Sequence, residues 1–410
     1  MLIESIINRI DHYRDDMIEM QRQLCALPAL APENQGDGEK EKADLVMSWL
    51  ERLPCSRLEL IKAPDDRVSC GYRPNLIAVL EGEDPSRTLW LMSHLDVVPP
   101  GDLSNWSGDP WSLRVEGDKL IGRGCEDNHQ GVVSSLFAAK AFADLNITPK
   151  INLGLMLVAD EETGSRYGVQ YLLTHHREFF RETDLFLIPD AGNPQGSMIE
   201  VAEKSILWLK FVIKGVQTHG STPHEGRNAH RAGAELIVRL NHLYKEFDAR
   251  DPLFDPPEST FEPTKKEANV PNINTIPGED IFYFDCRILP CYPIARVREA
   301  VQKHCDEVSR TFGVEIAIST PQEEPAAPPT PPDAEIVQAI QKAVSELRHL
   351  DCHPVGIGGG TVAAFFRRAG YPAAVWCTIA DVAHEPDEFC LLTNLVEDAK
   401  VFAHIALQDR

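Results

Sequence analysis

The chain has 410 residues, of which 43% are hydrophobic and 25% are charged, and its formal net charge is −23. A chain of this length and composition can bury large cores, and its length favours two domains. The acidic charge argues against nucleic acids and anionic membranes as partners, because a protein that binds either of them needs clustered positive charge.

Segment 3–27 opens the chain with an amphipathic, charge-rich pattern and has no apolar signal-peptide core. No window offers the ~18 apolar residues that a membrane span needs. The ten cysteines form no CxxC pair and no regular framework, which favours reduced, mostly buried thiols over disulfides. These features indicate a cytoplasmic protein.

Four short hydrophobic segments predict the buried strands of one sheet, because they are continuous rather than alternating in polarity. They are Thr88–Ser93, Ile151–Ala159, Asp184–Pro189 and Ala373–Thr378. Helical patterns lie between or after them, at 131–145 and 394–407. The order predicts an α/β fold with a mostly parallel mixed sheet and helices on both faces.

Histidines and carboxylates follow each of these segments, and in such sheets ligands bind beyond the carboxyl ends of the strands. In chain order these residues, together with Asp127, are His94, Asp96, Asp127, Glu161, Glu162, Asp190 and His384. Any one of them alone is more often a structural or solvated residue; their joint placement indicates a shared site. Imidazole and carboxylate ligands suit zinc, with cobalt or manganese as alternatives.

Two ions ~3.5 Å apart need a bridging carboxylate and a water or hydroxide between them as the nucleophile, and Asp127 can bridge. Asp96 lies two residues after His94, where a carboxylate can accept the second imidazole N–H and orient the ring. Of the neighbours Glu161 and Glu162, one is expected to face the metals and the other to serve as general base. The residues alone leave open which does which.

A change of pattern near 203 begins a second domain. Strands are expected at 206–214, 281–287 and 314–319, and helices at 228–247 and 294–312, which predicts an antiparallel sheet with two helices on one face. The segment 251–266 is expected to be a surface loop, and the Pro-rich segment 321–332 a stiff linker back to the first domain. The expected organisation is a catalytic domain of 1–205 and 321–410 with an inserted lid of 206–320.

Four ordered segments resemble a known family. They are Ser93–Pro99 (SHLDVVP), Trp106 with Asp109–Trp111 (DPW), Gly122–Gly124 leading to Asp127, and Ala159–Ser165 (ADEETGS). The family is that of dinuclear-zinc metallopeptidases and deacylases, which includes aminoacylase, carboxypeptidase G, acetylornithine deacetylase and succinyl-diaminopimelate desuccinylase. The resemblance covers most of the chain.

The resemblance implies a division of roles at the metals. It makes Asp127 the bridge, His94 and Asp190 the remaining ligands of one ion, and Glu162 and His384 those of the other. It also makes Glu161 the general base and Asp96 the residue that orients His94.

Further segments resemble the family's substrate-binding parts. His219 in HGSTP resembles the histidine that stabilises the oxyanion. Asn274 in NTIP, Arg287 in DCR, and Gly360 and Thr361 in GGGT resemble residues that meet the substrate's carboxylate, for which an arginine fork is suited. The family commonly dimerises through the lid, so the resemblance implies a homodimer in which His219 can act across the subunit boundary.

Two positions depart from the family pattern. His129 and Gln130 stand where family members commonly carry Lys-Gly, and Val362 stands where the family has Asp. Both changes leave the metal set intact and bear on the substrate instead. His129 is not expected to bind metal.

The sequence therefore predicts a metallohydrolase with two divalent ions that cleaves an amide bond next to a free carboxylate, with a metal-bridging water as nucleophile. Its substrate would be a small N-acyl amino acid or a short peptide. The alternatives are an aminopeptidase or dipeptidase on the same scaffold, and a non-catalytic metal- or peptide-binding protein.

Overall fold

The computed structural model describes residues 2–409. The chain folds into two compact units. The first comprises the chain up to Val201, then Pro329–Pro354, and finally the chain from Phe365 onward. The second comprises Ala202–Pro328 and Val355–Ala364.

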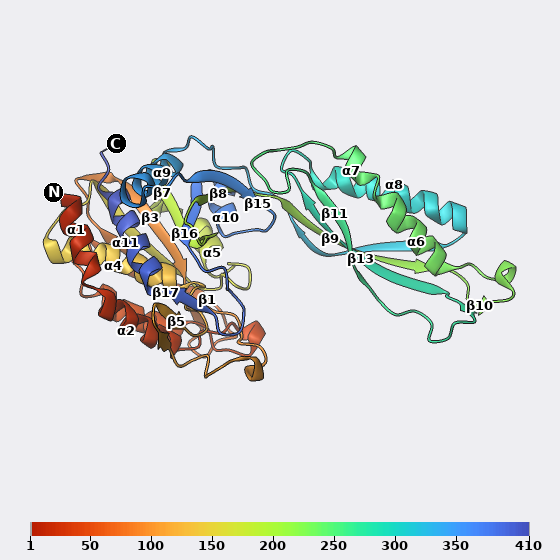
Figure 1. The fold of residues 1–410 in the computed structure, drawn as a ribbon, viewed down its shortest axis with the longest axis horizontal. Helices are drawn as coiled ribbons and strands as arrows, with labels where there is room; N and C mark the ends of the chain where they lie inside the picture. Colours follow the sequence, from red (N-terminus) through yellow and green to blue (C-terminus); the bar gives the residue numbers. More distant parts are fainter. Residues whose placement is uncertain (1, 410) are drawn as a thin grey trace. The chain divides into compact units, whose positions relative to one another are not determined.

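A mixed eight-stranded sheet forms the centre of the first unit (Figure 1). In sheet order its strands are β1 (Arg57–Pro64), β2 (Tyr72–Leu80), β6 (Ile151–Val158), β3 (Asp84–His94), β7 (Leu185–Asn193), β16 (Ala373–Thr378), β8 (Met198–Glu203) and β15 (His353–Ile357). The four central strands, β6, β3, β7 and β16, are parallel, and β1 and β2 add to them in antiparallel fashion. The central strands are almost wholly buried, which explains their continuous apolar sequences.

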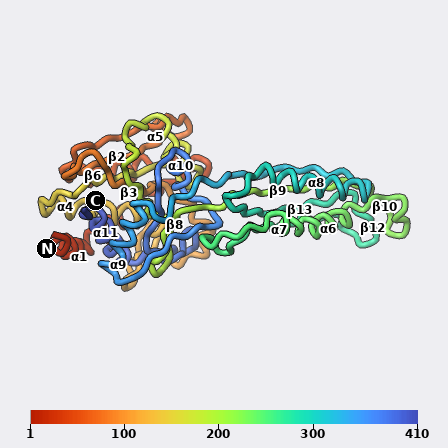
Figure 2. Tube along the Cα trace, turned by 90° about the horizontal axis from the view of Figure 1, so that it is seen from above, coloured from red at the N-terminus to blue at the C-terminus, as the bar shows by residue number. Residues whose placement is uncertain are grey.

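Helices cover both faces of this sheet (Figures 1 and 2). On one face α4 and α11 pack together, with α1 and α2 against them, and α5 and α10 lie on the other face. The helices of this unit are α1 (Leu2–Asp11), α2 (Arg14–Cys25), α3 (Lys40–Leu50), α4 (His129–Leu145), α5 (Val169–His175), α9 (Glu335–Arg348), α10 (Ala363–Arg368, which begins in the second unit) and α11 (Leu392–Ala406). A small sheet of β17 (Phe389–Leu391), β5 (Lys119–Ile121) and β4 (Arg114–Glu116) joins the loop before α4 to the chain before α11.

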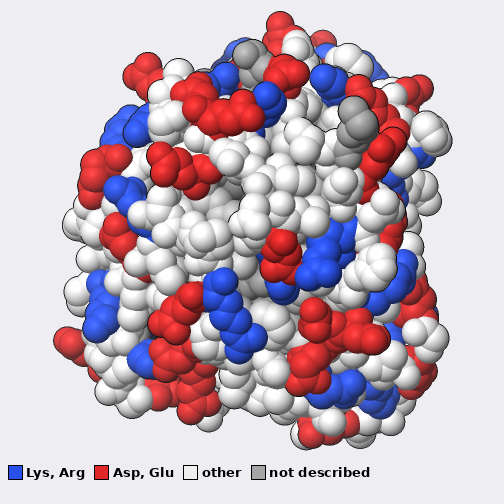
Figure 3. Space-filling view, turned by 90° about the vertical axis from the view of Figure 1, so that its left-hand side faces the viewer, with Lys and Arg blue, Asp and Glu red and all other residues white. Residues whose placement is uncertain are grey.

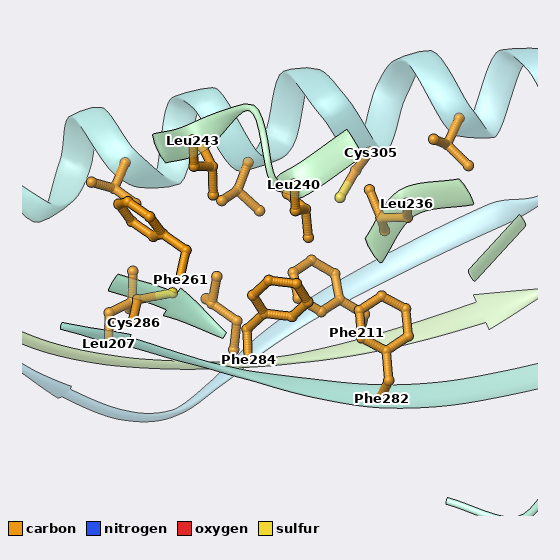
Figure 4. Packing of buried hydrophobic residues seen from close by; sticks show 14 of the residues in the cluster. Leu207, Phe211, Leu236, Leu240, Leu243, Phe261, Phe282, Phe284, Cys286 and Cys305 are labelled. Carbon is orange, nitrogen blue, oxygen red and sulfur yellow. The ribbon is translucent and has the colours of Figure 1, made fainter. Parts of the chain in front are cut away.

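The second unit is an antiparallel sheet with helices on one face. Its strands, in sheet order, are β11 (Thr260–Lys266), β13 (Glu279–Ile288), β9 (Ser205–Lys214) and β14 (Glu315–Glu324). The helices are α6 (Ala229–Leu240), α7 (Leu243–Glu246) and α8 (Ile294–Phe312), and a two-stranded ribbon pairs β10 (Thr218–His219) with β12 (Thr275–Ile276). Figure 4 shows the core, where aromatic and aliphatic side chains of the sheet meet those of the helices. The predicted fold class is confirmed.

Two segments differ from the expectation of irregular structure. The second half of 251–266 is the edge strand β11, and β14 extends through Pro321 to Glu324, into the expected linker. In both strands the pairing register shifts beside the proline, between Pro263 and Lys265 and between Ser319 and Gln322. Edge strands accept proline because its missing N–H faces away from the sheet. The single helix expected at 228–247 is divided into α6 and α7.

Among residues 2–409, no helix is long and apolar enough to cross a membrane. On the face shown in Figure 3, acidic and basic side chains are interspersed rather than gathered by sign. The ten cysteines are free thiols, and seven of them are buried.

Candidate active site

The ends of four parallel strands deliver the predicted ligands to one edge of the first unit. His94 is the last residue of β3, Glu161 and Glu162 follow β6, and Asp190 lies near the end of β7. His384 follows β16, and its backbone adopts a left-handed conformation with φ 66°. Asp127 precedes α4, in the loop that reaches the same edge. Residues spread over nearly three hundred positions thus meet in one place.

The Asp127 carboxylate lies between two imidazoles. Its Oδ1 is 2.8 Å from His94 Nε2, and its Oδ2 is 3.0 Å from His384 Nε2. Asp190 Oδ1 lies 3.3 Å from His94 Nε2, and Glu162 Oε2 lies 3.2 Å from His384 Nε2. We call His94, Asp127 and Asp190 the His94 half of the site, and Asp127, Glu162 and His384 the His384 half.

Both glutamates lie close to His94, but they differ in their other neighbours. Donor atoms of His94, Glu161 and Asp190 lie within 4.8 Å of one another, as do those of His94, Asp127 and Glu162. Only Glu162 of the two glutamates makes a close contact with His384. The geometry therefore sets Glu161 beside the His94 half and Glu162 in the His384 half.

Asp96 ties two strand ends together. Its fully buried carboxylate accepts the backbone N–H groups of Glu161 and Glu162, both at 3.0 Å. His94 Nδ1 lies 3.0 Å from the backbone oxygen of Asp96 and 3.4 Å from its carboxylate. The residue expected to orient one imidazole therefore also holds the turn that carries both glutamates.

A network of buried charged side chains stabilises the turn at residues 160–162, which carries both glutamates. Arg73 is fully buried and forms a two-pronged pair with Glu39, with Nε at 2.7 Å from Oε2. Arg73 Nη1 lies 3.6 Å from Asp160 Oδ1, and Glu39 Oε1 accepts the N–H of Asp160 at 3.3 Å. Asp160 takes a left-handed φ of 66°, which turns the chain into Glu161. The backbone of this turn is thus stabilised by Arg73, a buried arginine that is paired with Glu39.

Replacing Arg73 with methionine should lower the free energy of unfolding by about 3 to 5 kcal/mol, because it leaves the buried carboxyl group of Glu39 without its arginine partner. Urea unfolding of the metal-free protein measures this. The double variant Arg73→Met/Glu39→Met should recover part of the loss, since it removes both charges. A loss below about 1 kcal/mol for the single variant, the worth of an exposed pair, would contradict the role assigned to Arg73.

The residues after Asp127 have structural partners. Asn128 Nδ2 donates to Asp190 Oδ1 at 2.6 Å and to the backbone oxygen of Pro189 at 2.7 Å, so it fixes a predicted ligand. His129 is buried at the start of α4 and its Nε2 pairs with the buried Lys42 Nζ at 2.7 Å. The contacts of Asn128, Arg73 and Lys42 were not foreseen, because each partner lies tens of residues away in the sequence and no local pattern marks it.

The electrostatics of the cluster fit a bound cation. Burial lowers the pKa of His94, yet its carboxylate neighbours, Asp190 foremost, hold that pKa well above its usual value. Burial raises the pKa of Glu162 to about 7 and raises the pKa of Glu161 well above its ordinary value. Negative charge is thus crowded into a desolvated space, which a positive ion relieves.

One buried carboxylate oxygen also fits a bound ion. Glu162 Oε1 is buried and has no hydrogen-bond partner among residues 2–409, although buried polar atoms are almost always paired. The candidate ligands offer the imidazole nitrogens of His94 and His384 together with carboxylate oxygens, which suits divalent transition metals. The residues present therefore fit divalent ions at this edge.

The remaining predicted residues belong to the second unit and gather in two places. His219 on β10 pairs with Thr275 on β12, and the backbone oxygen of Asn274 accepts the N–H of Gly220 at 2.6 Å. His219 Nδ1 lies 2.7 Å from the Ser221 hydroxyl. His219 and Asn274 are thus neighbours on one ribbon.

Arg287 and the GGGT loop form the second place. Arg287 Nε and Nη2 donate to Asp285 at 2.7 and 3.0 Å, and Nη1 donates to the backbone oxygen of Gly358 at 2.8 Å. The Thr361 hydroxyl donates to Glu203 at 2.7 Å, and Gly360 lies against the Glu324 carboxylate. The arginine fork is engaged by protein groups here, and its contact with substrate stays a prediction.

The fold and the strand-end cluster define a metal-dependent hydrolase that acts on peptide or amide bonds. The chain belongs to the peptidase family M20/M25/M40, whose family model matches residues 90–408. The resemblance found in the sequence is therefore confirmed.

Relatives and solved structures agree with this membership. The chain is 40% identical to an uncharacterised metallohydrolase of Methanocaldococcus jannaschii, over 95% of this chain and 98% of the relative. It is 28% identical to a succinyl-diaminopimelate desuccinylase of Rhodospirillum centenum, over 94% of this chain and 95% of that one. Its fold is similar to that of human carnosine dipeptidase 1, with a TM-score of 0.73, 19% identity and coverage of 99% and 98%.

Proposed function

We propose that the chain is a dinuclear metallohydrolase that cleaves an amide bond next to a free carboxylate, as an N-acyl amino acid deacylase or a metallocarboxypeptidase. One observation carries the proposal: the two oxygens of Asp127 face different imidazoles, at 2.8 and 3.0 Å. A carboxylate shared in this way is what two neighbouring ions require.

Five residues would hold the ions: His94, Asp127, Asp190, Glu162 and His384. Their nitrogen and oxygen donors suit zinc, with cobalt and manganese as alternatives. When bound, the ions would polarise the scissile carbonyl and lower the pKa of the attacking water.

Glu161 acts as the general base in this proposal. Its carboxylate lies beside the His94 half, and burial raises its pKa well above the ordinary value, which makes it a stronger base. Glu161 takes the proton of the attacking water and delivers it to the leaving nitrogen. Asp96, by accepting the N–H of Glu161, fixes where that base sits.

The substrate class rests on similarity and on residue chemistry. The similarity to a desuccinylase supports a substrate whose amide lies next to a carboxylate. Arginine is suited to that carboxylate, which keeps Arg287 as the proposed contact. Oxyanion stabilisation by His219, substrate contacts by Asn274, Gly360 and Thr361, and a homodimer stay predictions from the sequence.

Amidation of the substrate's carboxylate tests this class. Hydrolysis of N-acetyl and N-succinyl amino acids should exceed that of their C-terminal amides by about 10- to 100-fold in kcat/KM, the worth of the charge-assisted hydrogen bonds lost. Assays with zinc, cobalt and manganese in turn cover the three metals. Equal rates for acid and amide would contradict carboxylate recognition.

An aminopeptidase or dipeptidase is the rival supported by the fold shared with carnosine dipeptidase 1. Free dipeptides, included in the same panel, distinguish it: preference for them over N-acylated amino acids requires a site for the substrate's ammonium. Failure of the metal-loaded protein to hydrolyse any compound of the panel, with ligand binding unchanged by Glu161→Ala, would favour a binding protein instead.

A further inference from the structure

Two buried carboxylates that the proposed reaction does not use lie beside the ligands. Glu126 directly precedes Asp127, and Glu388 comes four residues after His384. They are 4% and 0% exposed, respectively. Glu126 lies in the loop that carries Asp127, and Glu388 lies in the loop that carries His384. We call these two the ligand loops, and each side chain bonds to the loop of the other.

Glu388 holds the loop of Asp127. Its Oε1 accepts the backbone N–H of Glu126 at 2.9 Å and that of Asp127 at 3.1 Å. Its Oε2 accepts the N–H of Gly124 at 3.1 Å and is 2.5 Å from Arg123 Nη1. The backbone oxygen of Glu388 accepts the N–H of Gly122 at 2.9 Å. Glu388, a single residue of the loop that carries His384, therefore accepts hydrogen bonds from most of the backbone N–H groups in the turn that presents Asp127.

Glu126 holds the loop of His384 in return. Its Oε2 and Oε1 accept the N–H groups of Ala380 and Val382, at 2.5 and 2.7 Å. Arg123 Nη2 adds a bond to the backbone oxygen of His384 at 3.2 Å. The two loops, more than 250 residues apart in the sequence, are thus bonded reciprocally through side chains on both.

Carboxylates are needed at both positions because every group they meet is a donor. A carboxylate accepts through both oxygens, whereas the amide of glutamine would turn an NH₂ group against one set of N–H donors. An isosteric Glu→Gln change therefore keeps the packing and breaks half of each set of bonds. It tests position rather than volume.

We propose that Glu126 and Glu388 are positioning residues that fix the Asp127 carboxylate and the His384 imidazole relative to each other, and so set the geometry of the His384 half. The proposal rests on the proposed metal site. Neither glutamate belongs to the groups of side chains that could hold a metal ion. Both act through the backbone that presents the ligands, as outer groups around metal sites commonly do.

Cobalt binding to Glu388→Gln tests the proposal without relying on activity. We expect the variant to bind the second Co²⁺ about 10- to 100-fold more weakly than the wild type, with a smaller loss of affinity for the first, since Asp127 also belongs to the His94 half. The visible absorption spectrum of the two-cobalt protein should change, because the coordination geometry of the His384 half changes. With saturating metal, kcat should fall while KM changes little.

Glu200→Gln is a matched control. Glu200 is fully buried and paired with a buried arginine, Arg367, as Glu388 is with Arg123, but it lies on β8 and belongs to neither ligand loop. The Glu200→Gln variant should lose as much stability as Glu388→Gln, while its cobalt affinities and absorption spectrum remain those of the wild type. Urea unfolding of the metal-free proteins places the two variants on one stability scale.

Glu126→Gln and the double variant complete the test. If both residues act on the same pair of loops, the combined loss of affinity should be smaller than the sum of the single losses, since the geometry is already broken by either. Glu388→Gln with wild-type cobalt affinities and spectrum would overturn the positioning role, as would losses shared equally by Glu200→Gln. A wild-type protein that takes up neither ion would overturn the proposed function, and this inference with it.

Discussion

Replacing Glu161 with glutamine should lower kcat/KM by about 10³-fold or more while the protein keeps its metal ions. Glutamine has nearly the same shape but cannot take a proton, and general base catalysis contributes about 10²- to 10⁴-fold. The carboxylate lies beside His94 and Asp190, with Asp127 already between the two imidazoles. Loss of the Glu161 carboxylate therefore removes proton transfer without removing one of the proposed metal ligands. Steady-state kinetics and metal analysis of the same preparation measure both effects.

Glu162→Gln is the matched control for this prediction, because the two residues are adjacent and both donate a backbone N–H to the Asp96 carboxylate. Glu162 lies 3.2 Å from His384, so its variant should lose affinity for the ion of the His384 half. The opposite result, with metal lost from Glu161→Gln and kept by Glu162→Gln, would exchange the two roles. The residues alone leave this division open and the family resemblance assigns it, and in the structure the contact of Glu162 with His384 distinguishes the two neighbours.

The meeting of the candidate site residues is predictable from the sequence because the central strands of the sheet follow a simple rule. Continuous apolar runs mark buried parallel strands, and the carboxyl ends of parallel strands meet at one edge. His94, Glu161, Glu162 and Asp190 follow such runs directly, so their meeting needed no knowledge of distant contacts. His384 is harder to place from the strand alone, since five residues separate it from the end of β16.

What holds the ligands could not be anticipated. Glu388, Arg73 and Asn128 bond to groups more than thirty residues away, and each would read as an ordinary surface or loop residue in its own segment. The strand β11 is not predicted for a different reason. The prolines of 251–266 indicate a loop, but only Pro263 lies within β11, where an edge strand with a shifted register accommodates it.

Replacing Asp127 with alanine should remove both ions, whereas replacing Asp190 should weaken one. Asp127 is the carboxylate shared by the two halves, with one oxygen toward each imidazole. Asp190 contacts only His94 of the two imidazoles, at 3.3 Å. We therefore expect near-zero metal stoichiometry for Asp127→Ala. For Asp190→Ala we expect one tightly bound ion, in the His384 half.

Activity should follow the same order. Each ion contributes several kcal/mol to the transition state, so loss of both should lower kcat/KM by more than about 10⁴-fold. Chelation followed by dialysis should inactivate the wild type, and adding zinc, cobalt or manganese should restore it but leave Asp127→Ala inactive. If Asp127→Ala retained one ion at full affinity, the carboxylate would belong to a single half. The two imidazoles would then serve separate sites rather than a shared pair of ions.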